Sequence, residues 1–480
     1  MSGLLLSSYF AMPVWAQNLI LSTYGLRLRY LRYGRYHAEV LKQLLVSQWL
    51  PADGLRELQL ASLNALLKHA VANVPFYRSQ GFPESASRLG DLSQLPILRK
   101  SDVRRAGRVL VASTSASRSL TQIHTGGTTG MPLTIFCDRA TLQRNYAFFA
   151  RLRTWAQVPP KGRVVTFAGR TFVSPDQPGP PYWRSNLAAN TLLMSSYFLS
   201  PRTIDAYIER IRSFRPDLID SYPSAVEVVA RRVARSGMHD IRPRAVITSS
   251  ETLSPAVRDL IRAAFACPVF DQYGGAEMAA FVSQCEKGSY HVNPEFGIVE
   301  ILRDGQPVQP GEEGEIVATG FINPVMPLIR YATGDSAVQG AVSCSCGRAF
   351  PTVERIEGRV EDVLVTPEGR RVGRLDPIFK SVSSIQEARI VQDASDHVRL
   401  EVVPDVGFGP QEAAMLVAEL ARLLGPSMRI DLVRVASIPR APSGASRTTA
   451  SRARRRRGSG TSAGTPRRSG WAAWTSRTTT

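Results

Sequence analysis

The chain has 480 residues, 44% of them hydrophobic and 21% charged, which is enough for a large core and two or three domains. Its net charge of +19 suggests a nucleic-acid partner, but the distribution of that charge argues against one. Ten arginines and no acidic residue lie between Pro439 and Thr480, so this segment supplies +10 of the charge and leaves +9 for the rest. We therefore expect no specific nucleic-acid partner.

The N-terminal segment is apolar and then basic. It lacks an early positive charge, and Pro13, Gln17 and Asn18 interrupt its apolar run, which excludes a good secretory signal and a membrane span. It is either a helix packed on the main domain or a peripheral contact with an anionic membrane through Arg27, Arg29, Arg32 and Arg35. Five cysteines do not form a disulfide framework, so we expect a cytoplasmic protein, with the second interpretation placing it at the inner membrane face.

Apolar spacing predicts a helical lead-in over residues 1–70, with helices that end before Pro75. Two short strands then flank a Gly-rich turn, and a helix follows from Arg139 to Trp155. Between residues 162 and 278, short apolar strands alternate with helices. This alternation predicts an α/β domain with parallel strands.

Residues 290–355 change to a hairpin pattern, with Asp304-Gly305 and Gly311 at turns. The following unit combines a hairpin at Gly369, a strand pair, a final strand and helices near 374–382 and 410–424.

These patterns predict an α/β protein with three parts. A large multi-subdomain N-terminal domain, residues 1–357, has mixed β-sheets flanked by helices. A small mobile α+β C-terminal domain follows over residues 358–444. The tail, residues 445–480, is rich in Arg, Ser and Thr without hydrophobic period, so we expect it to be disordered.

The densest Gly/Thr cluster is "TGGTTG", from Thr125 to Gly130. Glycines let backbone N–H groups approach an anion, and threonine hydroxyls add donors. Met131 stands where a nucleotide-binding P-loop would need its lysine. Taken alone, the cluster is either a phosphate-holding loop or a hairpin turn.

Other loops lie at predicted strand ends, where α/β sheets bind ligands, and they favour the phosphate-holding loop over the hairpin turn. Glu251 follows one strand, "DQYGGAEM" ends another, and "YATGD" and "IEGRVED" come later. In this order and spacing they resemble the phenylacetate–CoA ligase-like branch of the adenylate-forming superfamily, including its capsular-polysaccharide members. "NVPFYR", "HTGGTTGMP" and "CSCGR" fit too, and the resemblance runs from about residue 10 to 444.

The resemblance implies an ATP-dependent carboxylic acid–CoA ligase that forms an acyl-adenylate and then a thioester, with a role in polysaccharide biosynthesis. ATP, Mg²⁺ and coenzyme A are the implied cofactors, although the acceptor thiol is open between CoA and a carrier protein. Glu277, Thr128 and Arg359 take the catalytic roles, with Glu277 holding Mg²⁺. Asp335 would accept hydrogen bonds from the ribose hydroxyls. A structural ion pair or cap stays the alternative for Asp335 and Arg359.

The same resemblance implies which residues bind the nucleotide and the acid. Those around ATP are Thr125, Gly126, Gly127, Thr128, Thr129, Gly130, Glu251, Tyr273, Gly274, Gly275, Glu277, Asp335 and Arg359. The two glycines of "YGGAE" would leave space against the adenine, and Asp362 would lie near an interdomain hinge. His124, Tyr222 and Ser224 would border the acid, although His124 is equally suited to cap a strand.

One position departs from the family pattern. The family has a lysine in an SGK motif that neutralises the phosphate oxyanions, but "IPRAPSGASR" places Ala445 there. Arg440 and Arg447 lie nearby without lysine's compact ammonium. Because the motif decays where the Arg-rich tail begins, we hypothesise a reading-frame change near codon 445. The alternative function is an adenylation-impaired scaffold that binds nucleotide or acyl-adenylate.

Cys285, His291, Cys344 and Cys346 form a second constellation. Three thiolates and an imidazole suit a tetrahedral structural zinc ion, and similar proteins of this branch often carry such a set. Buried free cysteines are the other interpretation. We expect Cys137 and Cys267 to be core residues.

Overall fold

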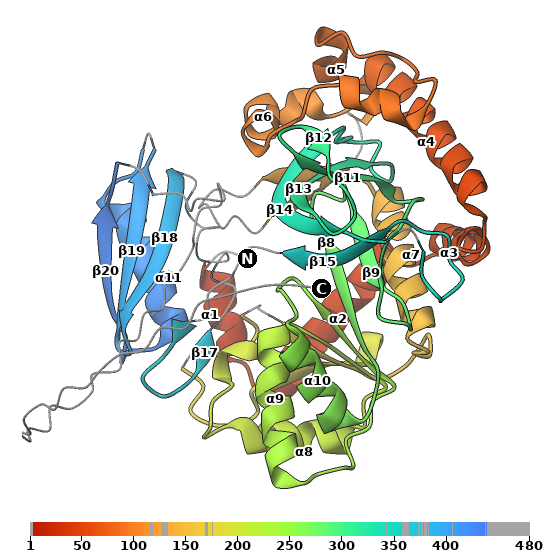
Figure 1. The fold of residues 1–480 in the computed structure, drawn as a ribbon. Helices are drawn as coiled ribbons and strands as arrows, with labels where there is room; N and C mark the ends of the chain where they lie inside the picture. The colour runs from red at the N-terminus through yellow and green to blue at the C-terminus, as the bar shows by residue number, and fades with distance from the viewer. Residues whose placement is uncertain are drawn as a thin grey trace, which may run out of the picture.

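The computed structural model describes residues 3–115, 119–125, 133–168, 171–174, 176–341, 343–357, 364–372, 384–405 and 407–436, with Leu375, Ile378, Val382 and Ile438. Figure 1 shows a large body and, beside it, a small blue module formed by the C-terminal strands. The predicted class, a mixed α/β domain with a small α+β C-terminal domain, is confirmed. The predicted disordered tail lies outside the described residues.

A series of helices opens the chain: α1 (Gly3–Ala11), α2 (Val14–Arg32), α3 (Arg35–Ser47), α4 (Ala52–Asn73), α5 (Pro75–Ser79) and α6 (Lys100–Ala106). Proline sets several boundaries, because it has no N–H and fits only the first turn of a helix. Pro13 separates α1 from α2, and Pro75 begins α5. Helix α4 therefore stops before Pro75, as predicted. No described helix has both the length and the apolar character to cross a membrane.

The large domain is built on a sheet of 13 strands in the order β12-β11-β13-β14-β15-β10-β9-β8-β7-β6-β3-β5-β4. Its parallel part contains β5 (Thr191–Ser195), β3 (Val164–Ala168), β6 (Leu218–Ser221), β7 (Ala245–Ser249) and β8 (Val269–Gly274). Strands β3, β6, β7 and β8 were predicted, whereas β5 was not. The edge strand β4 (Trp183–Asn186), antiparallel to β5, was not predicted either.

Both faces of this parallel part are buried, which explains its continuous apolar runs. Helices α8 (Ile204–Phe214), α9 (Pro223–Ser236) and α10 (Pro255–Phe265) cover one face, packing on side chains such as Val165 and Ile219. Helix α7 (Arg139–Trp155) packs on their neighbours Val164 and Leu218 on the other face (Figure 1). Successive strand residues thus point to opposite helical layers.

The antiparallel part contains β9 (Phe281–Gln284), β10 (Tyr290–Val292), β11 (Gly297–Arg303), β12 (Gln306–Pro307), β13 (Glu313–Gly320), β14 (Tyr331–Gln339) and β15 (Thr352–Glu357). Asp304 and Gly305 both have positive φ, 52° and 79°, as a tight hairpin between β11 and β12 requires. The hairpin prediction is confirmed. The strands continue the parallel sheet, because β9 pairs with β8.

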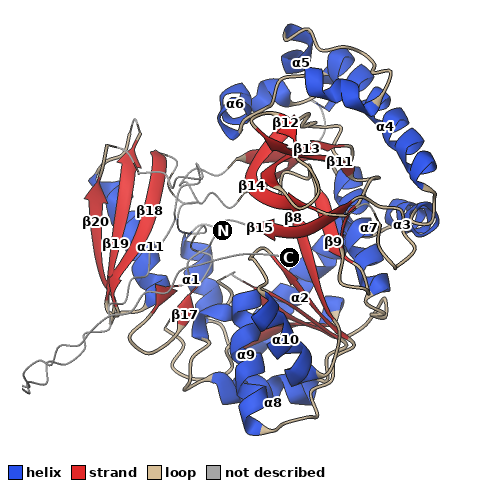
Figure 2. Cartoon of the chain, in the orientation of Figure 1, coloured by secondary structure: helices blue, strands red, loops and turns tan. Residues whose placement is uncertain are grey.

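The C-terminal module contains β16 (Leu364–Val365), β17 (Arg371–Val372), β18 (Ile385–Ala394), β19 (His397–Pro404), α11 (Pro410–Leu424) and β20 (Arg429–Arg434). Figure 2 shows α11 against the strand layer, and apolar side chains of both form one core. Gly369 has a φ of 77° in the turn between β16 and β17, as predicted. The helix expected near 374–382 falls mostly outside the described residues.

A candidate nucleotide and acid site at the carboxyl edge of the sheet

The predicted site residues gather where the parallel strands end. Strands β6, β7 and β8 run in the same direction, so their carboxyl ends share one edge of the sheet. Tyr222, Glu251 and Gly275 follow these three strands closely. Ligands of α/β sheets bind at this edge. Motifs far apart in the sequence therefore meet at one place.

Glu277 lies half-buried in the turn after β8, with its carboxylate between close neighbours. Tyr331 Oη donates to Glu277 Oε1 at 3.3 Å. A Cβ on Gly275 would lie 2.2 Å from Glu277 Oε2, and one on Gly274 would lie 2.8 Å from Gln272 Nε2. The lack of a side chain at Gly274 and Gly275 therefore makes room for the side chains of Gln272 and Glu277. The predicted space for adenine would be an additional requirement on the same two glycines.

Asp335 on β14 faces Tyr273 on β8. Tyr273 Oη donates to Asp335 Oδ2 at 2.9 Å. Burial, and then the nearby carboxylate of Asp335, raise the pKa of Tyr273 well above its ordinary value. The phenol therefore stays protonated and is the donor of this hydrogen bond. Strands β8 and β14 have three strands between them in the sheet order, so this hydrogen bond shows that the sheet curls back on itself.

Three residues with strained backbone adjoin these side chains. Ser250, Met278 and Arg330 have positive φ values of 72°, 55° and 50°, and each is the direct neighbour of a residue described here: Glu251, Glu277 and Tyr331. Side chains with a Cβ rarely adopt this conformation, and such strain clusters where ligands bind. The backbone thus supports the location that the motifs indicate.

The neck of the Gly/Thr loop is closed by Thr125 and Leu133. The N–H of Thr125 donates to the Leu133 carbonyl at 3.0 Å, and the N–H of Leu133 donates to Thr125 Oγ1 at 2.9 Å. Thr125 is buried, so its hydroxyl here holds the loop base. His124 is exposed, and its Nδ1 lies 3.2 Å from Thr134 Oγ1 across the β1 (Thr121–His124) and β2 (Thr134–Cys137) pair.

Glu251 shares one pocket with Tyr222 and Ser224, two of the three predicted acid-pocket residues, whereas the third, His124, does not line it. Ser224 donates to the Glu251 carboxylate through its N–H at 2.9 Å and its Oγ at 3.0 Å. The carboxylate thus sits at the N-terminus of α9, where the helix dipole favours negative charge. The pocket is partly open to solvent, and its cavity volume is small, about 10 Å³. Its lining is Ser196, Leu199, Tyr222, Ser224, Ala225, Val228 and Glu251.

The predicted Cys/His set is brought together, with its ligand atoms all within 4.8 Å of one another. Cys285 Sγ lies 3.8 Å from Cys344 Sγ, and Cys346 Sγ lies 3.4 Å from His291 Nε2. A tetrahedral zinc ion with Zn–S bonds of about 2.3 Å places two sulfur ligands about 3.8 Å apart. The spacing of these four residues therefore fits zinc.

The state of His291 and the loop geometry agree with that fit, although burial raises the pKa of the Cys285 thiol to about 12. Burial lowers the pKa of His291 to about 4, so its imidazole is neutral, the form that binds metal. The N–H of Lys287 donates to Cys285 Sγ at 3.4 Å, and the N–H of Cys346 donates to Cys344 Sγ at 3.5 Å. Cys137 and Cys267 are buried in apolar clusters, as expected.

Comparison with known proteins points in the same direction. A sequence profile of the CapK C-terminal domain matches residues 364–452. Protein CapK of Staphylococcus aureus is 26% identical over 400 residues, covering 82% of this chain and 86% of that protein. Phenylacetate-coenzyme A ligase of Thermus thermophilus is 25% identical over 337 residues, covering 66% and 73%.

Solved structures agree at the level of the fold. A 2-hydroxyisobutyryl-CoA ligase in its postadenylation state has a TM-score of 0.55 and 20% identity, covering 84% of this chain and 91% of that one. The same ligase in its thioesterification state also has a TM-score of 0.55. These comparisons support the resemblance of the chain to the phenylacetate–CoA ligase-like branch of the adenylate-forming superfamily.

Some residues that the ligase resemblance singles out lie outside the described residues. These are Gly126, Gly127, Thr128, Thr129, Gly130, Arg359, Asp362 and Ala445. Their roles stay predictions. Among the described residues, Glu251, Tyr222 and Ser224 form one group, and Tyr273, Glu277 and Asp335 form another.

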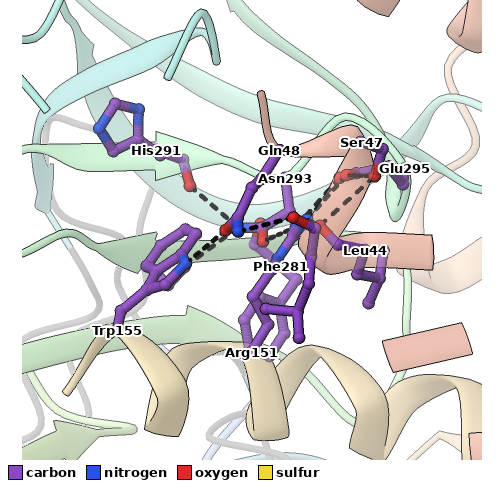
Figure 3. Close-up of polar contacts among 11 residues, drawn as sticks. Leu44, Ser47, Gln48, Arg151, Trp155, Phe281, His291, Asn293 and Glu295 are labelled. Carbon is purple, nitrogen blue, oxygen red and sulfur yellow. Dashed lines mark hydrogen bonds and ion pairs between the residues drawn. The ribbon is translucent and has the colours of Figure 1, made fainter. Parts of the chain in front are cut away.

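A buried network, which sequence reasoning missed, supports the Cys/His set (Figure 3). Arg151 on α7 has no exposed side-chain surface and donates to both carboxylate oxygens of Glu295, at 2.7 and 3.0 Å. Asn293 Nδ2 donates to the backbone carbonyl of His291 at 3.2 Å. The only sign of this network in the sequence is that charged residues occur among the apolar residues of α7.

Tyr331 and Ser196 were also missed, although both contact predicted residues. Tyr331 belongs to "YATGD", in which the sequence resemblance assigned a role only to the acidic residue, Asp335. Ser196 follows β5, a strand that the sequence pattern did not reveal.

Proposed function

We propose that the protein is an ATP-dependent carboxylic acid–CoA ligase. The observation that carries the proposal is that Glu277 and Asp335 both lie near Tyr273 at the end of β8, beside strained backbone, in a chain similar to such ligases. A carboxylate oxygen of the acid attacks the α-phosphorus of ATP, and the bond to pyrophosphate breaks. The sulfur of CoA then attacks the acyl carbonyl, loses its proton and displaces AMP.

The described residues divide this work between binding and orientation. Asp335 accepts hydrogen bonds from ribose hydroxyls, and the protonated Tyr273 fixes its orientation from the other side. The pocket with Tyr222, Ser224 and Glu251 at its mouth receives the acid. The loop closed by Thr125 and Leu133 approaches the β- and γ-phosphates through backbone N–H groups.

Magnesium fits the residues present. Mg²⁺ is bound by one or two carboxylates together with substrate phosphates, and Glu277 offers one carboxylate in the turn after β8. Glu277 would hold the ion, which neutralises charge on the phosphates. Zinc fits the Cys285, His291, Cys344 and Cys346 set, where it would have a structural role because its four ligands close the coordination sphere.

The biological role follows from the similarity to CapK. A protein of that name covers most of this chain, and its C-terminal domain profile matches here. We infer that the activated acid serves polysaccharide biosynthesis. A deletion strain that keeps its surface polysaccharide unchanged in amount and acyl content would count against this role.

Ala445 supports a second candidate function, an adenylation-impaired scaffold that binds nucleotide or acyl-adenylate. The in-line displacement places negative charge on phosphorus oxygens, and a preorganised cation there is worth orders of magnitude in rate. Alanine provides none. The substitution affects adenylation specifically, because in this family the thioester step does not need that lysine.

Pyrophosphate release with ATP, Mg²⁺ and a panel of aryl and hydroxy acids discriminates between the two functions. Acid-dependent release that falls about a hundredfold in Glu277→Gln supports the ligase. Retained ATP binding without release from any acid supports the scaffold. Loss of both ATP binding and release contradicts both. Glu84→Gln, at an exposed bend after α5, is the matched control.

A further inference from the structure

Helix α2 exposes a stripe of large apolar side chains. Trp15, Leu19, Leu26 and Tyr30 are 70%, 60%, 57% and 63% exposed. Their spacing of four, seven and four residues places them on one side of the helix. Leu187, in the turn that packs beside α2, is 79% exposed and extends the stripe. These five residues are called the α2 face below.

The opposite side of α2 is polar and faces the protein. Arg184 Nε donates to Gln17 Oε1 at 2.6 Å, and the N–H of Ser185 donates to Asn18 Oδ1 at 2.9 Å. The N–H of Leu187 donates to Ser22 Oγ at 3.0 Å. Leu31 also packs on the protein, but the large apolar side chains of the stripe face outward, unlike the usual apolar face of a surface helix.

The edge strand explains why the polar side faces inward. Strand β4 ends the 13-stranded sheet, so some of its backbone N–H groups have no strand partner. Asn18 and Ser22 accept hydrogen bonds from this edge, and Gly25 lets the helix approach Asn186, since a Cβ there would lie 2.4 Å from that side chain. Polar contacts hold the helix, so the apolar stripe is available for another partner.

Charge indicates what that partner is. The first acidic residue of the chain is Glu39, whereas Arg27 and Arg29 are exposed on α2 and Arg35 follows it. A partner must therefore accept large apolar side chains and cations together. A second copy of the chain would place these arginines against their own equivalents in a two-fold contact, which is unfavourable.

We propose that the α2 face docks on an anionic lipid bilayer, with α2 lying in the plane of the interface. Tryptophan and tyrosine favour the headgroup level, and leucines enter the upper acyl region. Arg27 and Arg29 then reach anionic headgroups, each contributing about fivefold in affinity near the surface. This binding is reversible, and it is independent of the ligase chemistry.

Co-sedimentation of the full chain with vesicles tests the proposal. We expect binding to phosphatidylcholine with about 30% phosphatidylserine, and little to phosphatidylcholine alone. Leu19→Ser with Leu26→Ser should weaken binding about tenfold or more. The matched control, Val46→Ser with Val109→Ser, removes exposed apolar side chains elsewhere and should change nothing.

The Arg-rich tail also attracts anionic lipid, but the leucine variant leaves the tail intact. Equal vesicle binding of wild type and leucine variant would therefore overturn the proposal. Brominated lipids give a second readout, since the quenching lost in Trp15→Phe reports whether Trp15 enters the bilayer. A concentration-dependent dimer that the leucine variant abolishes, without vesicle binding, would replace the bilayer with a second copy.

Discussion

Asp335 shows how one carboxylate can be held ready for a ligand. Its Oδ2 accepts from Tyr273, which fixes the side chain without neutralising it. A charged acceptor of this kind binds a neutral hydroxyl more tightly than an amide does, because charge-assisted hydrogen bonds are the stronger class. The acidic residue of "YATGD" therefore has a physical reason to be aspartate.

Asp335→Asn should raise the KM for ATP about 10- to 100-fold, since a hydrogen bond to a charged group contributes about 1.5–3 kcal/mol. Asparagine still accepts from Tyr273, so the fold should persist. Initial rates of pyrophosphate release against ATP concentration measure the effect. Asp304→Asn, in the exposed turn after β11, is the matched control, and an equal change in both variants would contradict the ribose role.

At the residue scale, the sequence pattern identified the charged residues and glycines of the candidate site more readily than its residues with hydroxyl groups. Glu277 and Gly275 stand out because a carboxylate and a glycine in one turn have few structural uses. Tyr331 does not stand out, because a tyrosine at a strand start fits a core equally well. Only the curl of the sheet, which depends on long-range pairing, brings its hydroxyl to Glu277.

The Cys/His set belongs to the scale of elements, since it joins the turn between β9 and β10 to the loop before β15. Arg348 in that loop pairs with Glu286 at 2.9 and 3.0 Å, and its guanidinium lies over the rings of Trp49 and Trp155. The loop is therefore anchored from both sides. A metal ion would complete the connection.

The purified protein should contain about one zinc per chain, and Cys346→Ser should lose it together with several kcal/mol of stability. Elemental analysis and the thermal unfolding midpoint measure the two effects. Cys267→Ser, which changes a core cysteine, should keep the zinc. Zinc-free wild-type protein with an unchanged midpoint would favour the free-cysteine interpretation.

Helix α7 carries two arginines whose environments differ. Arg151 is fully buried against Glu295, whereas Arg153 is 36% exposed and pairs with Asp220 at 3.5 Å. Removing one partner of a buried pair leaves an uncompensated charge, whereas an exposed pair contributes little. Making the same substitution at Arg151 and Arg153 therefore separates the effect of burial on stability from the effect of losing a charge.

Arg151→Met should destabilise the large domain by about 3–5 kcal/mol, and Arg153→Met by about 1 kcal/mol or less. Urea unfolding followed by tryptophan fluorescence measures both. Adding Glu295→Leu to Arg151→Met should restore much of the loss, because the second charge is removed as well. No difference between the two arginine variants would show that the network carries no stability.

The helices were predictable at this scale because local signals define them, such as Pro75 before α5 and Gly237 after α9. The edge strand β4 was not, because "WRSN" has no apolar alternation. It is held by β5 on one side and by the polar side of α2 on the other. Contacts between residues so far apart leave no local pattern.

For the whole molecule, the question is how the two domains divide the reaction. Arg370 in the C-terminal module donates to the carbonyls of Tyr197 and Leu423, at 2.8 and 3.3 Å. Tyr197 lies next to Ser196, a pocket residue. The C-terminal module is thus anchored beside the pocket that Ser196 lines.

Ala445→Lys should raise acid-dependent pyrophosphate release about a hundredfold, since it returns a cation to the oxyanions of the displacement step. Ala441→Lys adds the same charge four residues earlier and is the matched control. Thioester formation from supplied acyl-adenylate should be equal in all three proteins. A rise in the first variant alone would identify the chain as a ligase that lacks its cation. No rise, with ATP still bound, would favour the scaffold, and translation of the alternative frames at codon 445 then decides whether a native lysine was lost.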